Sequence, residues 1–439
     1  MIPWLTTETL TIIFMDNPTP GKYEVQSYGK PSILNIKYSL VANASIDKPQ
    51  VSRSNETGCV LNVQYDFNEN QPLFITRKRY FPKFRISNGL VRIRETEKIR
   101  LHCGNSNIIY KGNHLKSVDG AKVTSVDLLC LRNKTFYVKE SEKYTINYYN
   151  IIHFQCDKPF KTILMKNKQK CSNLKTKLFS IGFALSTLYM GLYDVCFNLE
   201  TKSPSFTRYT IQTGMADYIP SYRYSIRDKH AVDYELAFDC EKQKEHLTPH
   251  TYLKTWGGTC CFVRRHLVSP RDVFPGLPQL ATYENFNVVA HWNFCKETNN
   301  WDEIEQKIRL LLKTIDKLSV WTGTFGGIKN FTLNSHNINV DLSVHVPKYL
   351  WKVIHNKAVK SSLAIIQINI PFLTIDEAKR HVRCKDICDQ IKWLRGTDWR
   401  DVNRGYTYCC RVLDFEKAFS YENRFRDVHK IFRYMQEQV

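Results

Sequence analysis

The sequence predicts a mixed α/β (α+β) fold, with a small β-rich domain over residues 1–155 and a larger domain over residues 156–439. Residues 1 to about 150 hold short segments of branched and aromatic residues between turn signals, with no helix-length periodic segment. A lysine-rich stretch follows at about 151–175, and helical and strand patterns mix beyond it. An apolar fraction of 43% over 439 residues is enough to bury a sizeable core.

In the N-terminal domain, segments rich in branched and aromatic residues predict strands at 60–65, 90–93 and 136–138. The Ser-Asn-Gly at 87–89 and the Asp-Gly at 119–120 are turn signals, because these residues tolerate the backbone conformations of tight turns. We therefore expect this domain to consist of strands joined by turns.

One amphipathic helix is predicted in the larger domain, over residues 301–318. Either Asn299 or Asn300 suits its capping position, and Asp302 and Glu303 suit the positive end of its dipole. Its apolar residues recur at helical spacing: Trp301, Ile304, Ile308, Leu311, Leu312, Ile315 and Leu318.

Two charged residues, Glu305 and Arg309, fall at the edge of the apolar arc of this helix. One interpretation is that the carboxylate and the guanidinium line a cleft. The other is an ordinary ion pair between residues four apart, which stabilises a helix by only about 0.2–0.5 kcal/mol. The spacing alone favours the second interpretation.

The charge balance points to a polyanionic partner. Lys and Arg total 63 against 42 Asp and Glu, which gives a formal net charge of +21. Such an excess favours binding to phosphates, because neutralising them releases counterions. Solubility and attraction to another anionic surface are the alternatives. No segment approaches the roughly 18 apolar residues of a membrane-spanning helix.

The cysteines and sequons predict a secreted, disulfide-bonded glycoprotein. The chain has 14 cysteines, an even number spread along its length, which suits an oxidising compartment. The first 16 residues lack the basic segment and the long apolar run of a signal peptide. Four N-x-S/T sequons agree with export, at Asn43, Asn55, Asn133 and Asn330.

Four cysteines near the C-terminus allow two interpretations. Cys384, Cys388, Cys409 and Cys410 are numerous enough for a tetrahedral zinc site. An adjacent cysteine pair is awkward for tetrahedral ligation, and the sequons favour disulfides. The sequence does not give their connectivity.

The residues between 261 and 309 include a set suited to phosphodiester hydrolysis. This reaction needs a base of near-neutral pKa, usually His, and positive charge on the phosphoryl oxygens. His266 follows Arg264 by two residues, and Asn287 comes about 20 residues later. With Glu305 and Arg309 they make a candidate site, although a lone His is more often structural.

A series of motifs surrounds these residues. They are Arg264-Arg265-His266-Leu267, Asp272-Val273-Phe274, Ala281-Thr282-Tyr283, Asn287, Trp301 with Glu305 and Arg309, Trp321-Thr322-Gly323-Thr324, residues 347–353, Asn369-Ile370-Pro371 and the cysteine-rich tail. In these motifs the chain resembles the DNA/RNA non-specific endonucleases, the ββα-metal nucleases, and most of all their arthropod branch that degrades double-stranded RNA. The resemblance covers about residues 260–415. It implies a nuclease domain with a central antiparallel sheet flanked by helices.

The resemblance also implies roles for five residues. His266 would be the general base, Arg264 would contact phosphate, and Asn287 would help to arrange the site. Glu305 would hold metal-bound water, and Arg309 would stabilise the charge that develops on phosphate. The implied cofactor is a hydrated Mg²⁺, or Mn²⁺ in its place, and the implied substrate is RNA or DNA of any base sequence, with a tilt toward double-stranded RNA.

Three positions depart from the family signature. Arg265 replaces the Gly between the motif's Arg and His, so it is expected to distort the site or to add a phosphate contact. The family has its metal-binding Asn four residues before the Trp, and counting back from Trp301 places Glu297 at that position. Counting forward from Asn287 instead places Lys296 there. We predict Glu297 as the metal ligand, since a carboxylate suits Mg²⁺.

The third departure is Ala290-His291 in place of Pro-Gln. These changes leave two alternatives to a metal-dependent endonuclease. One is an impaired homologue that only binds nucleic acid. The other is a secreted, disulfide-rich interaction protein without a nucleic-acid role.

Overall fold

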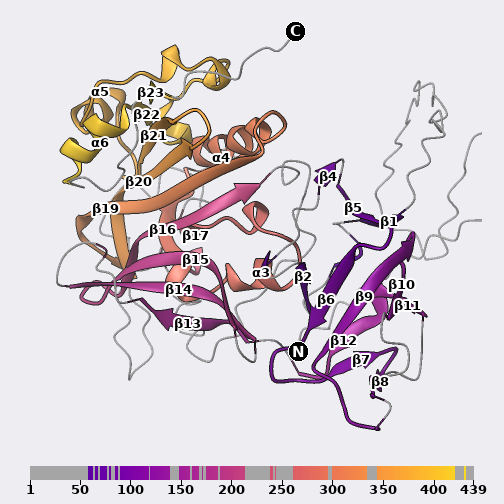
Figure 1. Cartoon of the computed structure of the whole chain (residues 1–439). Coiled ribbons are helices and arrows are strands. Elements are labelled where there is room, and N and C mark those ends of the chain that lie inside the picture. Colours follow the sequence, from indigo (N-terminus) through magenta and orange to yellow (C-terminus); the bar gives the residue numbers. More distant parts are fainter. Residues whose placement is uncertain are drawn as a thin grey trace, which may run out of the picture. The chain divides into compact units, whose positions relative to one another are not determined.

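The structure is a computed structural model of the whole chain (Figure 1). All described residues lie in Glu56–Val439, one of the two units into which the chain divides. The described residues are 58–62, 65–67, 70–76, 79–80, 85–87, 89–117, 119–138, 148–158, 161–167, 171, 175–185, 188–212, 238–240, 243, 261–294, 299–333, 344–420 and 430–431.

Residues 58–156 form three small antiparallel sheets, with strand orders β1-β5-β4, β11-β10-β9-β6-β2-β3 and β12-β7-β8. Their strands are β1 (Gly58–Asn62), β2 (Leu73–Thr76), β3 (Arg79–Tyr80), β4 (Arg85–Ser87), β5 (Leu90–Arg94), β6 (Lys98–His102), β7 (Ile108–Tyr110), β8 (Asn113–His114), β9 (Ser125–Arg132), β10 (Thr135–Val138), β11 (Tyr148–Asn150) and β12 (Phe154–Cys156).

The predicted strands at 90–93 and 136–138 are confirmed as β5 and β10, and the one predicted at 60–65 is β1, which ends at Asn62. Alternation along β5 explains its stability. Val91 and Ile93 are buried, whereas Arg92 and Arg94 are exposed, as expected for a strand with one face on a core.

The larger part of the molecule is built on a nine-stranded sheet. Its order is β13-β14-β15-β16-β19-β20-β21-β22, and β23 pairs with β21 in parallel, whereas all other pairs are antiparallel. The strands are β13 (Ile163–Lys166), β14 (Thr176–Leu185), β15 (Leu188–Asn198), β16 (Ser203–Gln212), β19 (Lys317–Leu333), β20 (Val344–Asn356), β21 (Ser361–Ile368), β22 (Thr407–Cys410) and β23 (Lys430–Ile431).

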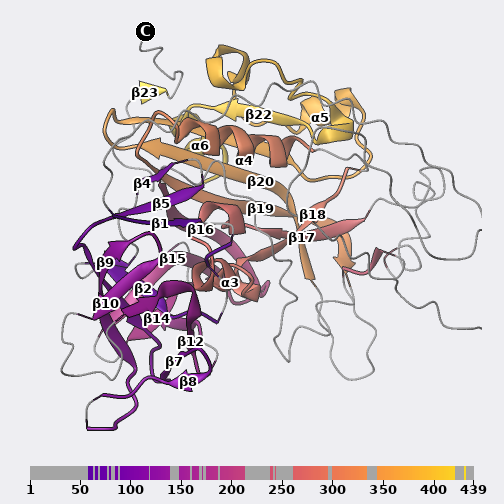
Figure 2. The same ribbon diagram turned by 90° about the vertical axis from the view of Figure 1, so that its right-hand side faces the viewer.

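The centre of this sheet is buried on both faces, because alternate residues enter two different cores. On β21, Leu363 and Ile365 join one core, and Ala364 and Ile366 join the other. The helix α4 (Asn300–Leu311) packs in the first core with residues of β19 and β20 (Figure 2). Helices α5 (Ile375–Arg380) and α6 (Val412–Ala418) pack in the second. The predicted antiparallel sheet flanked by helices is therefore confirmed.

The predicted helix over 301–318 is correct at its start and wrong at its end. Asn299 is the capping residue, and its side chain accepts a hydrogen bond from the backbone N–H of Asp302. The helix ends at Leu311, whose carbonyl accepts from the hydroxyl and the N–H of Thr314. A hydroxyl bonded in this way competes with continuation of the helix. Leu318 lies in β19, so its burial belongs to the sheet.

The β-rich part and the large sheet share apolar contacts. The ring of Phe67 packs edge-on against that of Phe274, with centroids 4.8 Å apart. Leu73 and Ile75 of β2 join a cluster with Leu277 of the short helix α3 (Leu277–Ala281). The division at 155/156 stays a prediction, since the sheets on its two sides are separate while their cores touch.

Six disulfides connect the twelve cysteines that the structure describes. The C-terminal cysteines form Cys384–Cys410 and Cys388–Cys409, so disulfides, not zinc, account for them. The other pairs are Cys59–Cys130, Cys103–Cys156, Cys171–Cys196 and Cys240–Cys261. Cys260 and Cys295 lie outside the described residues.

The sequon at Asn133 lies in an exposed turn between β9 and β10, a position open to modification. Asn43 and Asn55 lie outside the described residues, and at Asn330 only the strand is described. None of the described helices is long and apolar enough to cross a membrane.

Candidate active site

The candidate residues lie in the chain segment inserted between β16 and β19. Strands β17 (Phe262–His266) and β18 (Val288–Trp292) pair in antiparallel fashion, with His266 opposite Val288. Since successive side chains of a strand alternate, Arg264 and His266 share one face of β17, and Arg265 faces the other way. The strand therefore separates the two arginines that flank the histidine motif.

Among the described residues the imidazole of His266 has no hydrogen-bond partner, and its Nε2 atom is buried. The ring of Tyr283 packs edge-on against it, with centroids 4.7 Å apart. Burial, with a further contribution from the charges of Arg265 and Arg264, lowers the pKa of His266 to about 4. The imidazole is therefore neutral at pH 7, which is the form that accepts a proton.

Asn287 fixes the loop that follows His266. It ends a short 3-10 helix, Asn285–Asn287, and is fully buried. Its Oδ1 accepts from the N–H of Val268 at 2.8 Å, and its Nδ2 donates to the carbonyls of Val268 and Thr282 at 3.0 and 2.7 Å. These bonds account for both Nδ2 donors, so Asn287 holds the backbone of the loop, and its role in arranging the site stays a prediction.

Arg265 is held on the far side of β17 from His266. Its Nη1 lies 2.5 Å from Asp302 Oδ1 in the first turn of α4, and its Nε donates to His291 Nδ1 at 3.4 Å. The ladder with Val289 is intact at Arg265, so the replacement of glycine does not distort the strand. Its predicted phosphate contact stays a prediction, and in the structure the guanidinium faces Asp302 and His291.

Two departures from the family signature, Arg265 and His291, thus contact each other. A guanidinium can only donate, so His291 Nδ1 accepts and its proton lies on Nε2. This Nε2 is 2.6 Å from Gln367 Oε1, to which it donates. Burial and the charge of Arg265 lower the pKa of His291 well below its ordinary value, so this histidine stays neutral.

Glu305 and Arg309 belong to a closed ring of five buried side chains, which we call the polar ring. Arg309 Nη1 is 2.8 Å from Asp272 Oδ1, and the hydroxyl of Tyr209 donates to Asp272 Oδ2 at 2.8 Å. Lys352 Nζ donates to the Tyr209 oxygen at 3.3 Å and lies 3.4 Å from Glu305 Oε1. Glu305 Oε2 closes the ring at 4.0 Å from Arg309 Nη1.

The polar ring has no net charge, because two carboxylates face two cations. Burial alone would lower the pKa of Arg309, but the carboxylates of Asp272 and Glu305 raise it above its ordinary value. Burial and the Asp272 charge raise the pKa of Tyr209 well above its ordinary value. The guanidinium of Arg309 therefore stays charged and the phenol of Tyr209 stays protonated across the ordinary pH range, and the ring ties α4 to β16 and β20.

The sequence indicated only part of the polar ring. Glu305 and Arg309 were predicted, whereas Tyr209 and Lys352 were not. The sequence held a signal for Lys352, because this residue stands among apolar residues of its segment. In the structure its side chain is 1% exposed. A lysine in such a strand needs a buried partner.

The structure brings Arg264, His266 and Asn287 together, and Glu305 with Arg309. Within the described part of the chain, no hydrogen bond or ion pair joins His266 to either residue of the second group. Their predicted contacts, with metal-bound water for Glu305 and with phosphate for Arg309, stay predictions.

The predicted metal ligand Glu297 and its neighbour Lys296 lie outside the described residues. Two described groups with suitable oxygens are engaged, since Asn287 Oδ1 accepts the N–H of Val268 and the Glu305 carboxylate faces Lys352. The described part of the site therefore does not by itself fit a hydrated divalent ion beside His266.

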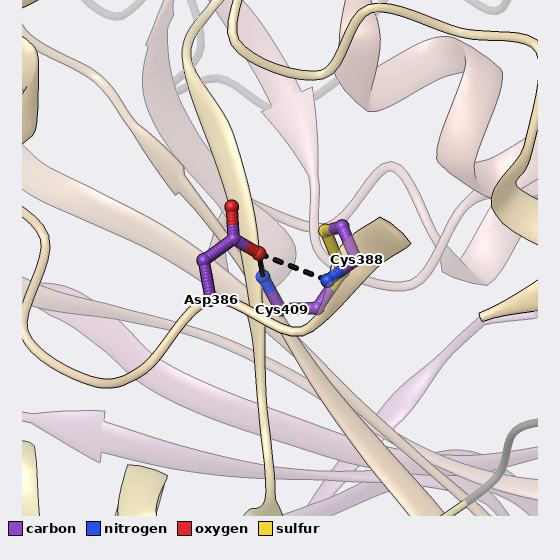
Figure 3. A group of neighbouring side chains, drawn as sticks. All are labelled: Asp386, Cys388 and Cys409. Carbon is purple, nitrogen blue, oxygen red and sulfur yellow. Dashed lines mark hydrogen bonds between the residues drawn. A yellow bond between two sulfur atoms is a disulfide. The ribbon is translucent and has the colours of Figure 1, made fainter. Parts of the chain in front are cut away.

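A different group, Asp386 with Cys388 and Cys409, has metal-like spacing, but its sulfur atoms are bonded to each other (Figure 3). Asp386 Oδ1 accepts from the N–H groups of both cysteines, at 2.9 and 3.1 Å. The carboxylate thus braces a disulfide, and Arg400 neutralises it at 2.9 Å. Disulfide sulfurs do not bind a metal as thiolates do, so this group is structural.

Comparisons with known proteins agree with the sequence motifs. Residues 172–415 match the family model described as DNA/RNA non-specific endonuclease. Salivary protein Tsal1 of Glossina morsitans morsitans is 23% identical over 380 residues, which cover 80% of this chain and 88% of that protein. Salivary protein Tsal2A of the same organism is 23% identical over 313 residues, covering 70% and 77%. A chain in the crystal structure of the EndoG/EndoGI complex is 15% identical, with a TM-score of 0.25, covering 43% of this chain and 80% of that one.

Proposed function

The chain belongs to the DNA/RNA non-specific endonuclease family, and we propose that it is a metal-dependent endonuclease that hydrolyses phosphodiester bonds without regard to base sequence. One observation carries this proposal. His266 is a neutral imidazole that has no hydrogen-bond partner in the part of the chain that the structure describes, and it stands at the end of a strand beside Arg264. A base that is free of partners and close to a guanidinium suits attack on a phosphate.

In the proposed reaction, His266 takes a proton from a water molecule as the water oxygen bonds to phosphorus. The bond from phosphorus to the leaving sugar oxygen breaks, and that oxygen takes up a proton. Arg264 binds the phosphoryl oxygens and offsets their charge. Asn287 contributes indirectly, because it holds the loop after His266 through Val268 and Thr282.

Nucleases of this family use a divalent metal ion, which supplies positive charge to the phosphate. We assign the ligand role to Glu297 and the ion to Mg²⁺, with Mn²⁺ as a substitute, on the sequence position and on the preference of these ions for carboxylate oxygen. The loss of cleavage in EDTA and its return with Mg²⁺ would support this assignment.

We further propose that the substrate is RNA or DNA, with a preference for double-stranded RNA, and that the protein is secreted. The net charge of +21 supports a polyanionic substrate. The preference for double-stranded RNA rests on the resemblance to the arthropod branch. Secretion is supported by six disulfides and by two relatives named as salivary proteins.

A second candidate function is nucleic-acid binding without cleavage. The polar ring favours it, because Glu305 and Arg309 are turned to buried partners. A protein that has lost catalysis but kept its basic surface would still bind phosphates in a salt-dependent manner.

The deciding experiment measures binding and cleavage of RNA and DNA duplexes of one sequence, with Mg²⁺ and with EDTA. We expect cleavage that His266→Ala reduces by about 10²–10⁴-fold while binding is retained. His381→Ala is the matched control, since His381 caps α5, outside the site, and should leave the rate unchanged.

Undiminished cleavage by His266→Ala would show that the base is misassigned. Binding without cleavage in the unmodified protein would support the second candidate. No binding at low salt would leave the third interpretation, a disulfide-rich interaction protein.

A further inference from the structure

On one face of α4, the charges of the described residues do not balance. Asp302, Glu305 and Arg309 recur at spacings of three and four, so they lie along one face of the helix. The carboxylates at this face are Asp272, Asp302 and Glu305, and the cations are Arg265, Arg271, Arg309 and Lys352. Among the residues that the structure describes, four cations therefore meet three carboxylates at this face.

Each carboxylate already has its own cation. Arg265 pairs with Asp302 at 2.5 Å, Arg309 with Asp272 at 2.8 Å, and Lys352 with Glu305 at 3.4 Å. The cation that remains is Arg271. Its side chain has no hydrogen bond or ion pair with any part of the chain that the structure describes, and its Nε is buried.

The position of Arg271 is fixed from both sides. It lies in the 3-10 helix Pro270–Asp272, where Ser269 caps its backbone N–H. Before it, Val268 is bonded to Asn287 through both its N–H and its carbonyl. After it, Asp272 is part of the polar ring. The guanidinium is thus presented by a rigid segment and not by a free loop.

The surroundings of Arg271 are unfavourable for a positive charge that has no partner. Its burial, with the nearby guanidinium of Arg309, lowers the pKa of Arg271 below its ordinary value. The carboxylates that oppose this effect are those already paired with other cations. A half-buried guanidinium with a buried, unbonded N–H is costly to a fold, and an oxyanion bonded to it removes that cost.

We propose that Arg271 binds a phosphate group of the nucleic acid, as a contact additional to the five residues of the family signature. The proposal rests on the proposed function, because it takes the same phosphodiester ligand. A guanidinium suits this ligand, since its planar fork of donors can bind two oxygens of one phosphate. Arg271 would then hold the nucleic-acid strand in place while His266 takes the proton from water.

The test is equilibrium binding of a fluorescent RNA or DNA duplex in EDTA, over a range of salt concentrations, so that cleavage does not interfere. Arg271→Gln should weaken binding by roughly tenfold and reduce the slope of log K against log salt by about one, as for the loss of one phosphate contact. Arg271→Lys should keep the slope and lose part of the affinity, because it keeps the charge without the fork.

The matched control is Arg208→Gln, which also removes one half-exposed arginine. Arg208 is 2.5 Å from Asp194 on the neighbouring strand, so its charge is already neutralised, and binding should change less than twofold. Thermal unfolding separates a binding role from a structural one. Arg271→Gln should unfold no earlier than the unmodified protein, because it removes a half-buried charge that has no hydrogen bond or ion pair among the described residues.

If the unmodified protein binds the duplex and Arg271→Gln binds with the same affinity and the same salt slope, the inference is wrong and the proposed function stands. If the variant unfolds early, Arg271 has a structural partner and the inference is again wrong. If the unmodified protein does not bind either duplex at low salt, the proposed function fails first.

Discussion

Two neighbouring groups of polar side chains differ in how completely they are satisfied. In the polar ring, each of Tyr209, Asp272, Glu305, Arg309 and Lys352 faces at least two other members. At the end of β17, by contrast, no described residue forms a hydrogen bond with the imidazole of His266. The side chain of Arg271 is likewise unpaired within the described residues.

The difference indicates which group has a structural role and which is available to a ligand. A ring of mutually compensating charges gains nothing from a ligand, because each charge already has its counterpart, and opening the ring is costly. Unpaired buried polar atoms destabilise a fold, so their presence favours a role outside it. Among the described residues, buried atoms without partners also occur elsewhere, at Trp301 Nε1 and, within the polar ring, at Arg309 Nε. His266 differs from those cases by the two arginines beside it.

The largest expected effect comes from opening the polar ring. Arg309→Met leaves the buried Asp272 carboxylate without its cation, and we expect the free energy of unfolding to fall by about 3–5 kcal/mol. Urea unfolding followed by circular dichroism measures it. Adding Asp272→Leu should recover part of the loss, because the uncompensated charge is removed as well.

The control for the ring is the exposed ion pair Lys379–Asp376, which joins residues three apart in α5. Lys379→Met should cost less than about 1 kcal/mol, as exposed pairs do. Should Arg309→Met prove as stable as Lys379→Met and yet fail to cleave, the ring is not structural and Arg309 regains its predicted catalytic role.

The sequence predicted local features of the fold better than their ends. Alternation gave β5, and capping residues gave the start of α4. The end of α4 was misplaced because Ile315 and Leu318 continue the helical spacing, although Leu318 is buried by pairing opposite Ile211 in the sheet. Periodicity reports which residues are buried, and the tertiary structure decides which element buries them.

The candidate site was predictable only where the motif is local. Arg264 and His266 share a face of β17, and Asn287 directly precedes β18, which pairs with β17 although residues 267–287 connect the two strands. The polar ring joins Arg309 to Asp272 and Glu305 to Lys352 across 37 and 47 residues, and no local spacing contains that information. The sequence analysis offered a cleft or an isolated ion pair for Glu305 and Arg309. The ion pair exists, but it is part of the five-membered polar ring.

A second prediction sharpens the comparison through pH. Because the pKa of His266 is lowered to about 4, the imidazole stays unprotonated down to that pH, and cleavage should be nearly constant from pH 7 to about 5. Below about pH 4 the rate constant should fall by about tenfold per unit. Single-turnover cleavage measures it, with circular dichroism to show that the protein is still folded.

The same lowered pKa has a consequence for stability. An unfolded chain protonates His266 near its ordinary pKa of about 6.5, before the folded protein does. This histidine therefore stabilises the fold fully above about pH 6.5, and the contribution is lost as the pH falls toward 4. His266→Gln should flatten that dependence, whereas an acid limb of cleavage near pH 6.5 would mean that the imidazole is more solvated than it is here.

The smallest effect is expected for Arg265→Met. It makes the same substitution as Arg309→Met, in an ion pair that is more exposed to solvent. The Arg309–Asp272 pair has side chains 3% and 2% exposed, whereas the Arg265–Asp302 pair has side chains 17% and 50% exposed. Arg265→Met leaves Asp302 open to water, so the free energy of unfolding should fall by only about 0.2–1 kcal/mol. The acid limb of cleavage should move to higher pH, because a positive charge that opposes protonation of His266 is removed. If Arg265→Met loses as much stability as Arg309→Met, the contact of Arg265 with His291, and not its ion pair, holds β17 to the core. The difference in solvent exposure between the two ion pairs would then not explain their contributions to stability.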